Sequence, residues 1–183
     1  MKMADTAFEA ELKAFEGRTV GGPQVARDPV NQPMIRHWCD AIDDQNPVYT
    51  EPELAQQSIH GSIVAPPTML QAWTMRGLRP PPQPESSEAN ASEDVLALLD
   101  DAGFTSVVAT NCVQEYRRYL HPGDHLSVTT TCDSVSPEKQ TALGIGHFVT
   151  QRQTYFDADG EEVASMLFRI LKFKPGTGAA AGG

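Results

Sequence analysis

Five histidines and three cysteines are the side chains of this 183-residue chain best suited to bind a metal ion or to act as nucleophiles. No cysteines form a CxxC pair, and the two histidines four positions apart flank a Pro-Gly turn. The sequence also lacks the GxSxG motif of serine hydrolases and a phosphate-binding glycine loop. We therefore expect no metal ion and no cofactor. The residues concerned are His37, His60, His121, His125, His147, Cys39, Cys112 and Cys132.

A polar segment, Asp44-Gln45-Asn46-Pro47-Val48-Tyr49, follows a predicted helix. A residue before proline is driven out of helical angles, so Asn46-Pro47 indicates a turn. From its position alone, Asp44 has two interpretations that stay open. It either completes the turn as a structural carboxylate or serves as a functional group beside it.

Residues 63–78 predict a buried helix on which the rest of the chain is organised. Pro66 and Pro67 suit the first helical turn, and Gly77 suits the C-terminus. The residues between them leave little of the helix circumference polar, which is typical of a helix buried all round. Plain core packing is the simplest role for each of them. These apolar residues are Met69, Leu70, Ala72, Trp73 and Met75.

Other helices are predicted from apolar residues at three- and four-residue spacing. In the helix at 31–43, Asn31 or Asp28 is the expected N-terminal cap. Three further helices are expected at residues 3–16, 51–59 and 94–101.

From Phe104 onward the apolar period changes from helical to two, which indicates strands. The links between them are short, and short links favour antiparallel neighbours. The last link, Asp157-Ala158-Asp159-Gly160, resembles part of a calcium loop but lacks the other ligands, so it predicts a hairpin turn. The expected strands are 104–119, 125–135, 140–156 and 162–174.

The last predicted strand is apolar on both faces. One face is expected to cover the buried helix, and the other face is expected to be covered by a second subunit. These elements predict an α+β fold in which a curved antiparallel sheet wraps one long central helix. The length suits a single domain. Residues 1–26 are expected to form a helical extension, 79–93 a surface loop or a lid, and 176–183 a flexible tail or a linker.

Charge narrows the classes of partner. The net charge is −10 and the pI is about 4.8, which argues against a nucleic-acid surface. The sequence has no apolar run long enough for a membrane span and no signal peptide pattern. The widely spaced cysteines are interpreted as buried apolar residues in a reducing compartment. Together these features predict a cytoplasmic protein.

Three segments resemble the MaoC-like (R)-specific enoyl-CoA hydratases and the FAS1-type dehydratase half-domains, which have the hot-dog fold. They also resemble, with three further segments, the larger MaoC-domain subunits of heteromeric steroid side-chain enoyl-CoA hydratases. The resemblance implies that 27–175 is the hot-dog domain. The first three segments are 44–51, 64–69 and 119–126, and the further three are 27–34, 107–112 and 168–175.

The resemblance also implies site residues and a departure. In the family a carboxylate and a histidine activate the water that adds to an enoyl thioester. Here Asp44 stands at the carboxylate position, but Tyr49 replaces the histidine. Tyrosine has an ordinary pKa of about 10, unsuited to a general base. The implied acyl-CoA-binding residues are Asn46, Tyr49, Val64, Ala65, Pro66, Met69 and Trp73.

We therefore expect the acyl-binding, catalytically degenerate subunit of a heteromeric hydratase, whose smaller hot-dog partner carries the aspartate and histidine. A downstream domain or a thiolase-type protein is a further expected partner. Two alternatives stay open. The chain could be a self-sufficient hydratase or dehydratase that uses Asp44, or an acyl-CoA-binding scaffold.

Overall fold

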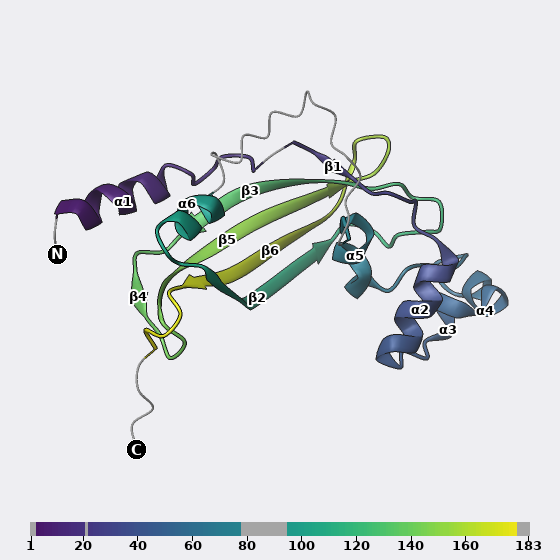
Figure 1. Ribbon diagram of the computed structural model, residues 1–183. Helices are drawn as coiled ribbons and strands as arrows, with labels where there is room; N and C mark the ends of the chain where they lie inside the picture. The colour runs from purple at the N-terminus through teal and green to yellow at the C-terminus, as the bar shows by residue number, and fades with distance from the viewer. Residues whose placement is uncertain (1–2, 21, 78–94, 179–183) are drawn as a thin grey trace, which may run out of the picture.

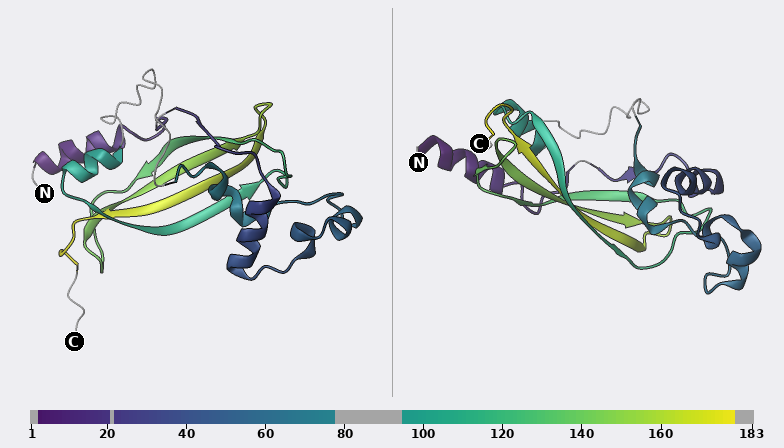
Figure 2. Two further views of the ribbon diagram at one scale, coloured as in Figure 1. Left: turned by 45° about the vertical axis from the view of Figure 1, so that its right-hand side comes forward. Right: turned by 90° about the horizontal axis from the view of Figure 1, so that it is seen from below.

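The computed structural model describes residues 3–20, 22–77 and 95–178 (Figure 1). The loop or lid predicted at 79–93 and residues 179–183 of the predicted tail lie outside them. Long antiparallel strands form one curved sheet, and short helices lie along one face and at one end (Figures 1 and 2). The α+β class predicted from the sequence is confirmed.

The sheet has the strand order β1-β3-β5-β6-β2, with β4 paired to β5, and every pairing is antiparallel. The four long strands lie within the ranges predicted from the period-two pattern. The strands are β1 (Gln24–Val25), β2 (Ser106–Tyr116), β3 (Ser127–Val135), β4 (Lys139–Gln140), β5 (Ile145–Phe156) and β6 (Glu162–Phe173). Because β1 pairs with β3, the predicted N-terminal extension contributes to the sheet.

The helices predicted at 3–16, 31–43, 51–59 and 94–101 are present. In α2 the side chain of Asn31 accepts a hydrogen bond from the Met34 amide at 3.0 Å, so Asn31 is the N-cap. A proline stands in the first turn of α2, α3 and α4. The helices are α1 (Met3–Lys13), α2 (Gln32–Ile42), α3 (Pro47–Thr50), α4 (Pro52–Gln57), α5 (Leu70–Thr74) and α6 (Val95–Asp101), with a 3-10 turn at Pro67–Met69 before α5.

The prediction of a long central helix at 63–78 is wrong in the length of the helix. After the 3-10 turn, α5 has only five residues, and Met75 is already extended. Pro66 and Pro67 supply no amide hydrogen for an earlier start. At the other end, the carbonyl of Thr74 accepts a hydrogen bond from the Gln24 side chain instead of from a further helical turn.

The short link between β2 and β3 predicted that these strands are antiparallel neighbours. This prediction is wrong, because β2 and β3 are not paired. β2 pairs with β6 at the sheet edge, and the chain then crosses the sheet end to reach β3. Arg118 stabilises this crossing. Its guanidinium bridges Asp124 in the crossing segment, at 2.7 Å, and Asp157 in the β5–β6 turn, at 3.1 Å.

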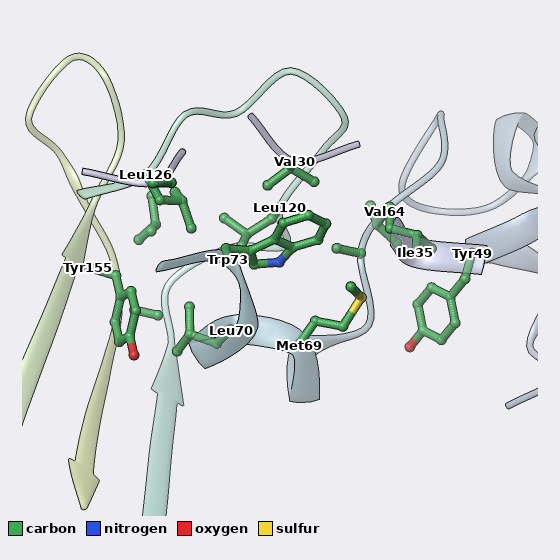
Figure 3. Close-up of a cluster of buried hydrophobic side chains, with 14 of the residues drawn as sticks. Val30, Ile35, Tyr49, Val64, Met69, Leu70, Trp73, Leu120, Leu126 and Tyr155 are labelled. Carbon is green, nitrogen blue, oxygen red and sulfur yellow. The ribbon is translucent and has the colours of Figure 1, made fainter. Parts of the chain in front are cut away.

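Two apolar clusters lie on the same face of the sheet, which we call the inner face. The first cluster joins α2 and the 64–73 segment to the strand ends beside α5 (Figure 3). The second cluster joins α1 and α6 to the opposite ends of the strands. Phe168 on β6 contacts both clusters. The inner face of the sheet therefore carries two hydrophobic cores, one toward each end of the long strands.

Within the described ranges, no helix is long and apolar enough to cross a membrane.

Replacing Arg118 with Met should lower the melting temperature by about 2–8 °C. Two partly exposed ion pairs contribute about 1–2 kcal/mol together, and 1 kcal/mol corresponds to about 2–4 °C in a chain of this size. Arg117→Met is the matched control, because among the described residues Arg117 forms an ion pair with Glu162 only, and its side chain is more exposed than that of Arg118. Equal shifts for the two variants would contradict the bridging role of Arg118.

The effect of Arg118→Met should also depend on pH. The pKa of Asp157 lies below its ordinary value, first because the Glu161 amide donates to its carboxylate and then because Arg118 does. A carboxyl with a lowered folded-state pKa stabilises the fold above its unfolded-state pKa of about 4 and loses that effect as pH falls. The difference in melting temperature between wild type and Arg118→Met should therefore shrink from pH 7 to pH 3.

Candidate functional site

The Asp44 turn forms directly after α2. Asp43 ends the helix in the left-handed region at φ 54°, and the Asp44 amide donates to the Cys39 carbonyl at 2.9 Å. One carboxylate oxygen of Asp44 accepts from the Asn46 amide at 3.1 Å. The Asn46 side chain in turn caps α3 by accepting from the Val48 amide at 3.3 Å. Both polar residues therefore have a structural role in the turn, and half-buried Asp44 keeps its second carboxylate oxygen for other contacts.

Tyr49 lies on α3 and is buried in the first apolar cluster. Burial raises its pKa above the ordinary value, and the nearby Tyr119 and Asp44 raise it further. Its hydroxyl therefore stays protonated at neutral pH and cannot serve as a general base. Asp44 thus lies near a neutral phenol where the resemblance leads one to look for a histidine.

The 64–67 segment offers no amide hydrogen to a ligand. The Val64 amide donates to the Val48 carbonyl at 3.4 Å, and the Ala65 amide donates to the Leu120 carbonyl at 2.8 Å. Pro66 and Pro67 have no amide hydrogen. An oxyanion that forms during a reaction needs such donors, so this segment cannot stabilise one.

A cavity of about 90 Å³ lies between the start of α5 and the ends of β2 and β6. Of the predicted binding residues, it brings together Ala65 and Pro66. Tyr116, Arg118 and Tyr119 also line it. Sequence reasoning did not assign the two tyrosines to a binding site, although both lie within six residues of the Pro-Gly-Asp turn. The remaining lining residues are Pro67, Leu70, Leu120 and Ala164.

Met69 and Trp73 lie in the first apolar cluster instead of at a surface (Figure 3). Met69 is fully buried, and Val64 is equally inaccessible. The Trp73 indole nitrogen is buried without a hydrogen-bond partner in the described part of the chain. In this chain by itself they pack the core, and their contact with a ligand stays a prediction.

No group of three potential metal ligands occurs among the described residues. The Asp157 carboxylate instead accepts from the amides of Asp159 and Glu161 at 3.1 and 3.0 Å. This arrangement confirms the hairpin turn predicted for 157–160.

Comparison with known proteins identifies the family. The FAS1-like, dehydratase domain region description matches residues 15–166. The chain belongs to this family. It has the MaoC-like hot-dog fold, as the resemblance implied.

The relatives of this dehydratase domain include two alpha subunits. The probable enoyl-CoA hydratase alpha subunit of Thermomonospora curvata is 49% identical over 94% of this chain and 54% of its own length. The 3-oxo-4,17-pregnadiene-20-carboxyl-CoA hydratase alpha subunit of Mycobacterium tuberculosis is 49% identical over 84% of this chain and 48% of its own. The chain thus spans about half the length of these relatives.

A solved structure is similar over nearly the whole domain. One chain of the ChsH1–ChsH2 complex from Mycobacterium tuberculosis superimposes with a TM-score of 0.78 and 44% identity. The match covers 96% of this chain and 99% of that chain. The dehydratase domain is therefore similar to a protein solved in a complex.

Met69→Ala should reduce the free energy of unfolding by about 2–5 kcal/mol, because it leaves a cavity in a packed core. Met75→Ala is the control, because Met75 is 65% exposed. Urea unfolding of both variants measures the difference. A loss for Met69→Ala no larger than for Met75→Ala would show that Met69 is not a core residue.

Proposed function

We propose that this chain is the acyl-binding, catalytically degenerate subunit of a heteromeric (R)-specific enoyl-CoA hydratase. A smaller hot-dog subunit supplies the aspartate and histidine. The substrate is a bulky enoyl-CoA whose thioester is on the side chain of a steroid, of the class that the name of the Mycobacterium tuberculosis relative describes. The proposal includes a cytoplasmic location.

The observation that carries this proposal is the state of Tyr49. Hydration requires a base that takes a proton from water as the oxygen adds to the β-carbon, while a proton goes to the α-carbon. At the position of the family's histidine, this chain has a buried phenol whose raised pKa keeps it protonated. The lack of free amide donors at 64–67 supports the same conclusion, because the enolate oxygen would have no stabilising group there.

The shortened α5 supports a bulky acyl group. A helix running the length of the sheet would cover the inner face, but α5 occupies one end only (Figure 1). In the middle of the face, Gln151 and Phe168 are half-buried and Cys112 is exposed. Among the described residues no helix covers this stretch, so it is available for a rigid acyl group that a full-length helix would exclude.

The edge of the sheet supports a protein partner. β2 has eleven residues and pairs only on its β6 side among the described strands. An open edge leaves unpaired backbone donors and acceptors, and proteins normally cover one of this length. Val107 and Val113 on this strand are more than half exposed. A second hot-dog subunit would cover both the edge and these side chains.

Asp44→Asn in the complex with the smaller subunit should leave kcat/KM unchanged, because the catalytic pair lies in the partner. Loss of a true general acid or base costs about 10²- to 10⁴-fold. The assay follows the absorbance of the conjugated enoyl thioester. Asp43→Asn is the control for charge at the end of α2.

The chain alone should give no turnover with any enoyl-CoA. Turnover that Asp44→Asn abolishes would instead establish the self-sufficient hydratase. Full activity of the smaller subunit without this chain would leave only the scaffold role, with a thiolase-type protein or a further domain as its partner.

A further inference from the structure

Polar side chains cross the inner face at the level of Met166, a fully buried member of the first apolar cluster. The pairing register places Thr130, Gln153, Met166 and Gln114 opposite one another on β3, β5, β6 and β2. Residues opposite one another on neighbouring strands point to the same face. We call Thr130, Gln153 and Gln114 the polar row. All three are half-buried, and none belongs to either apolar cluster.

Each glutamine of the polar row is held by a tyrosine two residues further along its own strand. The Tyr155 hydroxyl donates to Gln153 Oε1 at 2.7 Å, and the Tyr116 hydroxyl donates to Gln114 Oε1. Tyr155 is fully buried, and this burial raises its pKa far above the ordinary value. Its hydroxyl therefore remains a donor. Because both amide oxygens are occupied, both glutamines present their NH₂ groups to the remaining space.

These NH₂ groups have little to bind within the chain. In the described part of the structure, Gln153 Nε2 forms no hydrogen bond, and Gln114 Nε2 reaches only the Met166 sulfur at 3.3 Å. A thioether is a weak acceptor. Beside Gln153 lies a hollow of about 170 Å³ at the C-terminal end of α5. Its other polar lining residues are Gln24, Gln71, Thr74 and Thr130.

The polar row lies away from the end of the sheet where the Asp44 turn is found. In Figures 1 and 2, α5 lies between α2–α3 and the middle of the sheet. An acyl group whose thioester is near α2–α3 would reach the polar row with its far end. Half-buried NH₂ groups facing a hydrocarbon would lose their contacts with water and gain no acceptor. An acceptor oxygen at that end would satisfy them.

We infer that the polar row binds a carbonyl oxygen that the acyl group carries far from the thioester, and that it selects such acyl groups over plain hydrocarbons. Gln153 and Gln114 are the specificity-determining donors, and Tyr155 and Tyr116 are positioning residues. The inference rests on the proposed function, because it assumes that the inner face holds the acyl group.

The test uses the complex of this chain with its smaller hot-dog subunit. Two enoyl-CoA thioesters are compared that differ only in a remote ring ketone, which is a methylene in the second. For the wild type, kcat/KM should favour the ketone by about tenfold to a hundredfold, the cost of leaving buried donors unpaired. In the double variant Gln153→Leu, Gln114→Leu this ratio should fall to about one, with the methylene substrate turned over at least as well.

Two further variants separate recognition from folding. Gln153→Glu replaces the free donor with an acceptor while Tyr155 still donates to the other oxygen, so a remote hydroxyl should become preferred over the ketone. Gln57→Leu, on exposed α4, should keep the wild-type ratio. A melting curve for each variant shows that it is folded.

Equal kcat/KM for the two thioesters with the wild type would overturn the inference and leave the proposed function in place, because the methylene substrate is hydrated. A preference that survives in the folded double variant would overturn it as well. If the complex hydrates neither thioester, the proposed function fails, and the inference fails with it.

Discussion

The hydrogen bond from the Gln24 side chain to the Thr74 carbonyl marks the constraint on which the rest of this structure depends. It satisfies a carbonyl at the end of α5, where a longer helix would use its own next turn. With the helix stopped there, α5 covers one end of the inner face, and among the described helices α1 and α6 cover the other. The division into two apolar clusters follows from that arrangement.

A sheet covered at its two ends needs other means of holding its middle. The antiparallel pairing of β5 with β6 runs from Gly146–Phe173 to Phe156–Glu162, and β2 continues on the β6 side. Phe168 contacts both clusters and links them across the uncovered stretch. The framework is therefore stabilised by backbone pairing where side-chain packing is thin, and the middle of the face can remain polar without loss of the fold.

The Asp44 turn shows how a sequence motif can survive with different chemistry. Asp44 and Asn46 keep the hydrogen bonds that shape the turn. Tyr49 packs into the core, and its phenol is neutral. The same backbone geometry can therefore persist without the basic group, which is consistent with a division of labour between two hot-dog subunits.

The sequence determined the features that depend on neighbours along the chain. The period-two pattern located the four long strands, Asn31 was one of two candidates for the cap of α2, and Asp157–Gly160 was identified as a turn. Tyr49, at the position where the resemblance implies a histidine, was also legible, because it is a matter of residue identity.

Only the tertiary structure decided the features that depend on residues far apart in the chain. The carbonyl at the end of α5 accepts a hydrogen bond from Gln24, fifty residues away. The place of β2 beside β6 depends on long-range pairing, which short links cannot reveal. The alignment of Gln153 with Gln114 across β6 arises in the same way. Local propensity acts over a few residues, whereas packing and strand register are set by segments that meet only after folding.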